Sequence, residues 1–282
     1  MKMKRNDLIY DIGMHKGEDS AYYLKKGFHV VAIEANPQLV ELCSKKFAGE
    51  IKNRQLTIIN GAISDAAGSG NKFVPFYINR QCSEWGTTVN SWVKRNENRG
   101  TSSEKIEVPV IDFSKVLQSY GIPYYMKIDI EGMDTLCLQT LLNFNEKPDF
   151  ISIESDKVSF QKLKDEIALF NKLGYNKFKA VNQSAVERLK EPLNTHEGNF
   201  LNYKFSYGSS GPFGRDLPDK WVKNRWIILQ YRLIFLGYKY YGDHSKVKKK
   251  LAFRILYKIL QKIVRQPIPG WYDTHAKHAS VE

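Results

Sequence analysis

The sequence predicts an α/β fold built around a mostly parallel, doubly wound β-sheet. Short apolar runs, typical of buried parallel strands, alternate along residues 8–181 with longer segments of helical composition. The first of these runs leads into a glycine turn, and the second ends at an acidic residue. The chain has 282 residues, of which 42% are hydrophobic, and this is enough for a sizeable core.

The first unit of this pattern has the features of a nucleotide-binding βαβ motif. Residues 8–12 form an apolar run, Gly13 and Gly17 bound the turn after it, and a segment of helical composition comes next. A second apolar run, residues 29–33, ends at Glu34. Glycines allow the backbone to pass close beneath a ligand at the helix N-terminus. An acid about twenty residues past the turn can accept hydrogen bonds from ribose hydroxyls.

The charge of this turn distinguishes between two classes of cofactor. The turn begins with Asp11, continues through Glu18 and Asp19, and lacks the third glycine of the dinucleotide-binding motif. These carboxylates would repel a pyrophosphate but attract a cationic sulfonium that also carries an ammonium group. The sequence therefore favours S-adenosylmethionine over NAD. The alternative is an ordinary βαβ unit with a solvated acidic turn.

The remaining elements of the α/β pattern follow in order. Further strands are expected at residues 56–63, 72–78, 105–111, 124–130, 149–155 and 177–181. Further helices are expected at residues 37–47, 113–120 and 160–173, with another that ends at Leu142. Asp112 is placed to cap the helix that follows it. Residues 80–100 are polar and irregular, and we expect a loop that becomes ordered over the substrate.

Late in the chain the pattern changes. A stretch rich in glycine, serine, proline and aromatic residues leads to residues 221–236, which are expected to be helical up to a break at Gly237. Residues 246–265 are amphipathic, with leucine and isoleucine on one helical face and lysine and arginine on the other. The last residues are expected to form a tail. We therefore predict a main domain over residues 1–223 and a basic helical extension over residues 224–282.

Positive charge is concentrated in this extension. The chain carries a formal net charge of +13, and residues 215–282 hold 15 Lys and Arg against 5 Asp and Glu. An anionic partner is therefore expected for the extension rather than for the main domain. We predict an anionic membrane surface, bound through residues 246–265. The alternative is that the apolar face of this segment packs on the main domain. Nucleic acid is disfavoured because this segment lacks the interleaved aromatic residues of a stacking platform.

Three features of the sequence bear on the compartment. The run after the basic start of the chain is interrupted by Asp7 and Asp11 and is not the apolar segment of a signal peptide, so no signal peptide is expected. No stretch approaches the roughly eighteen uncharged residues of a membrane-spanning helix. The three cysteines, Cys43, Cys82 and Cys137, are too widely spaced for a metal motif or a disulfide framework. We therefore predict a cytoplasmic protein, which the basic extension would hold peripherally on the inner face of the membrane.

Several stretches between residues 7 and 221 form a set of motifs. They are DIGMHKGEDSAYYLKKGF, VVAIEANP, NGAISD, KIDIEGMD, FISIESD and GSSGPFGRDLPDKW. In their order and spacing they resemble the FkbM family of S-adenosylmethionine-dependent methyltransferases. The resemblance implies a Rossmann-like class I methyltransferase fold. It also implies O-methylation of a sugar hydroxyl in a polysaccharide or a lipid-linked glycan.

The same resemblance implies how the cofactor is held across the carboxyl edge of the sheet. Glu34 would hold the ribose, and Asp129 would lie near the sulfonium or the amino group. The methionine part would be lined by Asp11, Gly13 and Gly17. Asp19 is a further cofactor-binding candidate, and His15 would either pack against the cofactor or lie on the plain surface. The residues expected near the adenine are Ala62, Ile63 and Asp65. The turn of this chain has fewer glycines than is common in the family.

A sugar hydroxyl is a weak nucleophile, so a base or a metal ion would assist methyl transfer. Acidic residues gather at or just after the ends of two strands expected to be neighbours: Asp129, Glu131, Asp134, Glu154 and Asp156. Asp129 and Glu154 are the candidate ligands of Mg²⁺, because clustered carboxylates suit hard cations. Without a metal, one of these acids or His196 would act as the base. Lys127 would then lower the pKa of the hydroxyl.

The glycan acceptor would contact the loop that follows residue 195. The candidate acceptor-binding residues are Ser209, Ser210 and Phe213. Secondary candidates are the aromatic residues Trp85, Trp92 and Trp221, which could stack on sugar faces. For each of these tryptophans, simple packing is the alternative.

Three other functions are compatible with parts of the sequence. An RNA methyltransferase would use the basic extension as its electrostatic footprint. A membrane-tethered adaptor would keep the fold without catalysis, although the presence of Asp11, Glu34 and Asp129 argues against it. An NAD-dependent sugar oxidoreductase is disfavoured by the acidic turn and the missing glycine.

Overall fold

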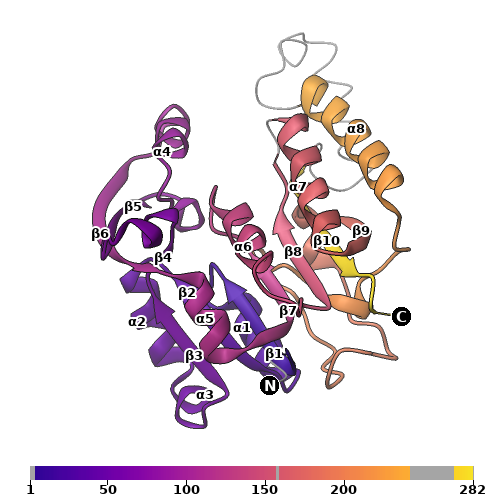
Figure 1. Cartoon of the computed structure of the whole chain (residues 1–282), viewed down its shortest axis with the longest axis horizontal. Helices are drawn as coiled ribbons and strands as arrows, with labels where there is room; N and C mark the ends of the chain where they lie inside the picture. The colour runs from indigo at the N-terminus through magenta and orange to yellow at the C-terminus, as the bar shows by residue number, and fades with distance from the viewer. Residues whose placement is uncertain (1–3, 157–158, 242–269, 282) are drawn as a thin grey trace.

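The core of the protein is a seven-stranded sheet in the order β3-β2-β1-β7-β8-β10-β9 (Figure 1). The computed structural model describes residues 4–156, 159–241 and 270–281. The strands are β1 (Lys4–Ile12), β2 (His29–Glu34), β3 (Leu56–Asn60), β7 (Ile122–Ile128), β8 (Phe150–Glu154), β9 (Tyr175–Asn182) and β10 (Tyr272–His278). All neighbouring pairs from β3 to β8 are parallel, and β10 pairs antiparallel with both of its neighbours, β8 and β9. The predicted doubly wound, mostly parallel sheet is therefore confirmed.

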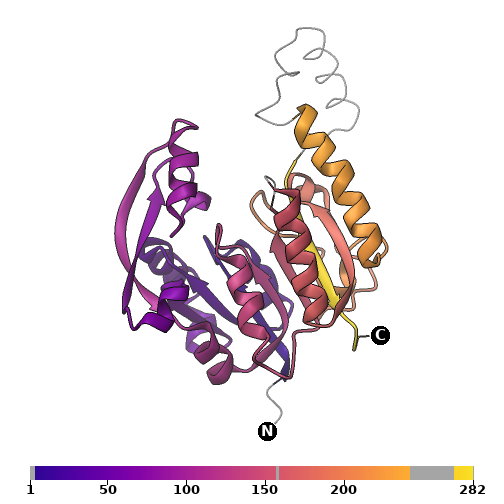
Figure 2. The same cartoon turned by 45° about the horizontal axis from the view of Figure 1, so that its top comes forward.

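Helices cover both faces of this sheet (Figure 2). Side chains alternate along β1, so that Leu8, Tyr10 and Ile12 point to one face while Ile9 points to the other. The first face packs against α5 (Phe113–Tyr120), α6 (Asp134–Leu141), α7 (Phe160–Lys172) and α8 (Asn224–Tyr241). The second face packs against α1 (Glu18–Lys25), α2 (Pro37–Lys46) and α3 (Ala48–Lys52). Asp112 caps α5 by accepting a hydrogen bond from the backbone N–H of Ser114, as predicted.

A second, three-stranded sheet lies beside the main sheet and carries α4 (Figure 1). Its strands, in the order β4-β6-β5, are β4 (Ala62–Ile63), β6 (Ser103–Ile111) and β5 (Phe73–Asn79). The expectation of one strand over residues 56–63 is wrong, because Gly61 separates β3 from β4. Gly61 has φ 148°, and a Cβ there would lie 2.5 Å from the carbonyl oxygen of Pro109. The expected loop at residues 80–100 is partly helical, since it contains α4 (Asn90–Glu97).

The C-terminal part differs most from the prediction. Gly237 does not break the helix, because α8 continues to Tyr241. The expected tail is instead β10, which fills the gap between β8 and β9 and buries Thr274, His275 and Ala276. The predicted extension over residues 224–282 therefore contains a strand of the main sheet. The amphipathic segment at residues 246–265 lies outside the described residues. No helix in the described part of the chain is both long enough and apolar enough to span a bilayer.

The segment between β9 and α8 covers the second face of the sheet. It begins with a short 3-10 helix, η3 (Gln183–Arg188), and buries Phe205 and Phe213 against α1. Lys26, directly after α1, holds this segment: its Nζ donates to Glu191 Oε1 and to Thr195 Oγ1 and lies 3.4 Å from Asp216 Oδ2. Because Lys26 precedes β2, this contact lies at the amino edge of the parallel strands.

Candidate functional site

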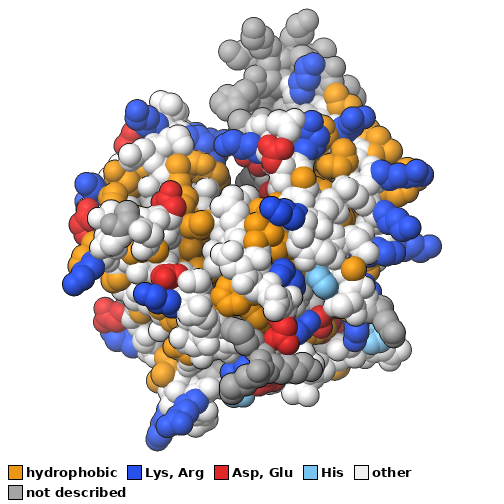
Figure 3. Space-filling view, in the orientation of Figure 1, with side chains coloured by type: hydrophobic (Ala, Val, Ile, Leu, Met, Phe, Trp, Pro, Cys, Tyr) orange, Lys and Arg blue, Asp and Glu red, His pale blue; other side chains and the backbone are white. Residues whose placement is uncertain are grey.

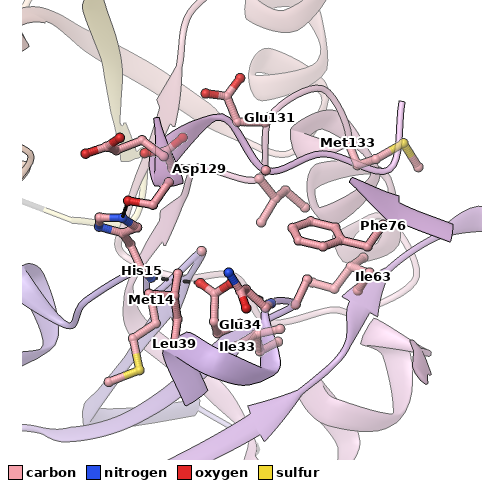
Figure 4. Close-up of a pocket in the computed structure, with 18 of the residues that line it drawn as sticks. Met14, His15, Ile33, Glu34, Leu39, Ile63, Phe76, Asp129, Glu131 and Met133 are labelled. Carbon is pink, nitrogen blue, oxygen red and sulfur yellow. Dashed lines mark hydrogen bonds between the residues drawn. The ribbon is translucent and has the colours of Figure 1, made fainter. Parts of the chain in front are cut away.

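A pocket opens at the carboxyl edge of the main sheet, where β1, β2 and β7 end (Figure 4). The strand order reverses direction between β1 and β7, and this switch point is the usual ligand site of open α/β sheets. The pocket encloses about 860 Å³, counting the space open to solvent. Its walls come from the turns after these three strands, from the second sheet and from the segment after β5.

The turn after β1 is shaped by its two glycines. Gly13 has φ 86°, and a Cβ at this position would lie 1.9 Å from the carbonyl oxygen of Asp129. Gly17 has φ 72°, and a Cβ there would lie 2.5 Å from the ring of Phe47. Both backbone conformations favour glycine, and both positions leave no space for a side chain. The turns after β1 and β7 are therefore packed against each other directly beneath the pocket.

Glu34, the last residue of β2, presents its carboxylate to the pocket (Figure 4). Its Oε2 accepts a hydrogen bond from the backbone N–H of His15 at 2.8 Å, and its Oε1 accepts one from Asn36 at 2.8 Å. Burial raises the pKa of Glu34, while these two backbone N–H groups act in the opposite direction. The carboxylate is thus fixed in place with lone pairs left over for ligand hydroxyls.

One wall of the pocket is apolar. It is formed by Ile33, Leu39, Ala62, Ile63 and Phe76. The Phe76 ring is contributed by β5 of the second sheet and faces the pocket opposite Glu34 (Figure 4). A flat, apolar ligand group could pack between this ring and the side chains of the main sheet. The predicted residues Ala62 and Ile63 therefore line the pocket.

The floor of the pocket holds a buried lysine among three acids. Lys127 Nζ donates to the carbonyl oxygen of Gly13 at 2.8 Å and lies 3.5 Å from Asp11, 3.9 Å from Asp19 and 3.8 Å from Asp129. Burial alone would lower the pKa of Lys127, but the three carboxylates outweigh it and raise the pKa above its ordinary value. Burial raises the pKa of Asp11 and of Asp19, despite the charge of Lys127. Three acids therefore face a single ammonium group at the pocket floor, and when they are ionised this arrangement can accept a further cation.

The segment that follows β5 contacts the turns at the edge of the pocket. His15, at φ 52°, contacts Ser83 Oγ through Nε2 at 2.8 Å, and its Nδ1 lies 3.4 Å from Glu18. Thr87 Oγ1 donates to the carbonyl oxygen of Glu131 at 2.8 Å. The segment that begins at residue 83 is therefore connected to the turns after both β1 and β7.

Three carboxylates lie together at the mouth of the pocket. Oxygen atoms of Asp129, Glu131 and Glu154 lie within 4.8 Å of one another. Arg95 of α4 lies 3.8 Å from Glu131. Asp134 has a different role: it accepts hydrogen bonds from the backbone N–H groups of Ile130 and Gly132 and so shapes the turn. Burial raises the pKa of Asp134 to about 6.

Several predicted site residues lie elsewhere. Asp65 is exposed and does not line the pocket. His196 lies near the amino edge, where its backbone N–H donates to Asp216, so it is too far from the carboxyl edge to be the base. Phe213 is fully buried and stacks on Tyr125 at a ring-centroid distance of 4.8 Å, so it offers no surface to an acceptor. The structure therefore places these three residues away from the pocket lining, because long-range packing decides where their loops lie.

Two other predicted residues act through their neighbours. Ser210 is buried and donates to both oxygens of Asp19, through its backbone N–H at 2.7 Å and its hydroxyl at 2.8 Å. Ser209 is buried beside it, and its hydroxyl donates to the carbonyl oxygen of Ser206. The loop therefore positions an acid of the pocket floor. Phe76, Leu39 and Ser83 also line the pocket but were not among the predicted site residues. In the sequence, only the apolar or polar character of each side chain could have suggested them.

The model of the methyltransferase FkbM domain family matches residues 11–177. No curated protein sequence matched the chain. A methyltransferase FkbM from Methylobacillus flagellatus is similar in structure, with 14% identity and a TM-score of 0.40. The similarity covers 64% of this chain and 41% of that protein, so this chain spans less than half of its length.

Two further solved structures illustrate the range of similar proteins. A phosphoethanolamine N-methyltransferase 2 from Haemonchus contortus shows 9% identity over 98% of this chain and 49% of its own, with a TM-score of 0.35. A S-adenosylmethionine-dependent methyltransferase from Thiobacillus denitrificans shows 12% identity over 98% of this chain and 86% of its own, with a TM-score of 0.34. The family model alone covers more than half of the sequence. This chain therefore belongs to the FkbM methyltransferase domain family.

Proposed function

We propose that this protein uses S-adenosylmethionine to methylate a sugar hydroxyl of a polysaccharide or a lipid-linked glycan. Membership of the methyltransferase family supports the reaction type. The observation that carries the cofactor assignment is the pocket floor, where Asp11, Asp19 and Asp129 surround the single ammonium group of Lys127. A nucleoside ligand that also carries positive charge fits such a site better than a dinucleotide does.

The lining of the pocket fits each part of this cofactor. Glu34 would accept hydrogen bonds from the ribose hydroxyls, since its carboxylate is already oriented by His15 and Asn36. The apolar wall around Phe76 would hold the adenine. Asp19 and Asp129, which line the pocket, would attract the ammonium and the sulfonium. When bound, the cofactor supplies an electrophilic methyl group.

The carboxylates at the mouth of the pocket are the proposed catalytic groups. One of Asp129, Glu131 and Glu154 would accept the proton of the acceptor hydroxyl as that oxygen becomes a nucleophile. Lys127 is not a base, because the surrounding acids keep its pKa above the ordinary value and its amine protonated. Lys127 instead orients the turn after β1 through the carbonyl oxygen of Gly13. Placing the reactants at the correct distance would provide much of the acceleration.

Mg²⁺ dependence is the second part of the mechanistic proposal. Asp129 and Glu154, joined by Glu131, offer the oxygen ligands that Mg²⁺ prefers. A thermal-shift titration with MgCl₂, compared between the wild type and Glu154→Gln, tests this directly. A stabilisation by Mg²⁺ that is lost in the variant supports the metal site. If MgCl₂ does not stabilise the wild type, the metal site is ruled out and the carboxylates act only as general bases.

The acceptor would approach over the segment that begins at residue 83. Trp85 and Trp92 of this segment are partly exposed, and aromatic rings of this kind can stack on sugar faces. Trp92 lies against Gly132, where an added Cβ would be 3.2 Å from its Nε1. Arg95 lies over the same ring at 4.0 Å from its centroid. These groups adjoin the carboxylate cluster and would orient a glycan hydroxyl toward it.

The proposal is tested with S-adenosylmethionine that carries a labelled methyl group. Purified protein would be incubated separately with cell-envelope glycans, lipid-linked glycans and total RNA. We expect label in a glycan fraction, and at least about a hundredfold less transfer with Asp129→Asn, because Asp129 faces the cofactor and is one of the three candidate bases, and loss of a general base typically costs this much. Asp65→Asn is the matched control and should retain full transfer. Label in RNA alone would contradict the glycan assignment and favour the RNA methyltransferase.

A further inference from the structure

The outer face of α8 carries an exposed apolar stripe. Trp226, Leu229, Leu233 and Leu236 recur at helical spacing and are all exposed, with 52% of Trp226 and 63% of Leu233 accessible to solvent. Large exposed apolar patches of this kind mark interaction sites in soluble proteins. Figure 3 shows hydrophobic side chains on the surface in the region of α8, with lysine and arginine side chains among and beside them.

The opposite face of α8 is firmly attached to the main sheet. Ile227 and Tyr231 are buried in the core. The hydroxyl of Tyr231 forms hydrogen bonds with Ser155 Oγ at 2.6 Å and with Thr274 Oγ1 at 2.7 Å. The apolar stripe is therefore not the inner face of a loosely packed helix. It is a fixed part of the outer surface.

Positive charge borders the stripe, and α8 itself contributes no negative charge. Arg225, Arg232 and Lys239 are exposed on α8, and the helix contains no acidic residue. A shallow hollow on the helix is lined by Arg225, Trp226, Leu229 and Arg232, among others. In the sequence, residues 221–270 hold twelve Lys and Arg and a single acid. The surface thus combines apolar contact area with cationic groups on one side.

This charge distribution selects among the candidate occupants. A second copy of α8, or the basic chain after it, would bring like charges together at the stripe. RNA would leave the leucines exposed, because stacking platforms use aromatic rings. A bilayer with anionic lipids satisfies both features, since acyl chains accept the stripe and phosphates pair with arginine. We propose that α8 docks on an anionic lipid bilayer, with the leucine stripe in the interface and Arg225 and Arg232 at the phosphates.

The docked helix would be directly connected to the candidate active site. Tyr231 of α8 contacts Ser155, which follows Glu154 of the carboxylate cluster in sequence. The backbone N–H of Ser155 donates to Tyr272, where the chain returns into β10 at the carboxyl edge. Membrane docking depends only on the surface of α8 and does not require the acceptor to be a glycan.

Vesicle flotation with the full chain tests this proposal. The probes are vesicles of phosphatidylcholine alone and vesicles in which about a third of the lipid is phosphatidylglycerol. The test variant is the double substitution Leu229→Glu with Leu233→Glu, and the matched control is Leu193→Glu, at a leucine that is 85% exposed elsewhere. We expect binding of the wild type and of the control to the anionic vesicles. The partition coefficient of the double variant should fall at least about tenfold.

Each contrary outcome has a definite meaning, provided that circular dichroism shows every variant to be folded. No binding of the wild type to anionic vesicles overturns the proposal. Equal binding of the wild type and the double variant also overturns it, and assigns the affinity to the basic residues after α8. Sedimentation that shows a wild-type dimer and a monomeric double variant, without vesicle binding, would identify a second copy as the occupant. RNA binding without vesicle binding would overturn it in favour of nucleic acid.

Discussion

Two buried lysines lie at opposite edges of the main sheet and differ in their surroundings. Lys26, at the amino edge, is paired with Glu191 and Asp216, and its side chain is completely enclosed. Lys127, at the carboxyl edge, faces Asp11, Asp19 and Asp129, and its site opens into the pocket. The residue type and the burial are similar. The number of acids around each ammonium group and the access to ligand differ.

This difference appears in the protonation of the acids. Burial acts to raise the pKa of Glu191, but the hydrogen bond and charge of Lys26 outweigh it and hold the pKa below its ordinary value. At the carboxyl edge burial prevails, and the pKa of Asp19 lies above its ordinary value. Lys26 faces two acids in a site closed to solvent, so its ion pairs support the fold, whereas Lys127 faces three acids at a pocket that a cationic ligand can enter.

The largest effect on stability is expected at the amino edge. Lys26→Met leaves Glu191 and Asp216 buried without their cation, and we expect a loss of about 3–5 kcal/mol in the free energy of unfolding. Urea denaturation measures this change. Lys25→Met, at the exposed neighbouring position, is the control and should remain within about 0.5 kcal/mol of the wild type. A stable Lys26→Met would mean that this pair does not hold the segment between β9 and α8.

The same acid-to-amide change should have opposite consequences at the two edges. Glu191→Gln weakens the contact with Lys26 and should lower the free energy of unfolding by about 1–3 kcal/mol. Asp19→Asn removes surplus negative charge and should leave stability at pH 7 unchanged or slightly higher, while the affinity for S-adenosylmethionine falls about tenfold. Denaturation and calorimetry on both variants measure the contrast. Equal destabilisation by both changes would refute the distinction between the edges.

Lowering the pH should affect ligand binding before it affects the fold. The raised pKa values of Asp11 and Asp19 mean that these acids take up protons at a higher pH than they do in the unfolded chain. Their protonation favours the folded state as the pH falls but removes charge that attracts the cationic ligand. Glu191 has a lowered pKa, so its contribution is complete above its unfolded pKa and is lost only as the pH falls through the lower folded value.

The measurement is calorimetric titration of S-adenosylmethionine at several pH values between 8 and 5, with urea denaturation at each pH. As the pH falls from 8 to 5, the affinity should decline. Protonation of Asp11 and Asp19 should not lower the free energy of unfolding over the same range. Asp19→Asn should show a flatter dependence of affinity on pH. An affinity that stays constant down to the pH of acid unfolding would contradict the surplus of charge at the carboxyl edge.

The smallest effect is expected at Asp65. The sequence places this residue near the adenine, but its side chain is exposed and lies outside the pocket lining. Asp65→Asn should therefore change the affinity for S-adenosylmethionine less than about twofold, because surface changes rarely exceed 0.5 kcal/mol. The same calorimetric titration checks this. A tenfold loss would show that the adenine extends beyond the apolar wall.

Local patterns were sufficient to predict six of the seven strands of the main sheet and two residues of the pocket. Glycine turns and the acid at the end of β2 act within one βαβ unit, so Gly13 and Glu34 could be located from spacing alone. The strand β10 was not predicted, because Asp273, Thr274 and His275 give it a polar composition although all three are buried. Its place depends on pairing with β8 and β9, which a local pattern does not encode.

Contacts between distant segments account for the remaining differences at the site. Phe76 reaches the pocket only because a second sheet packs beside the first. His196 was expected near the substrate, but Asp216 and the Lys26 contact hold its loop at the amino edge. Ser210 was expected to meet the acceptor and instead holds Asp19 from below. Such placements follow from tertiary packing rather than from residue type.

The central claim is that the pocket at the carboxyl edge binds S-adenosylmethionine with its ribose on Glu34. Calorimetric titration of the purified full chain, compared with Glu34→Ala, tests it most directly. We expect saturable binding to the wild type and an affinity about tenfold to a hundredfold lower in the variant, because a hydrogen bond to a charged acceptor is lost. Thermal unfolding of both proteins confirms that they are folded. A folded wild type that does not bind S-adenosylmethionine would contradict the claim.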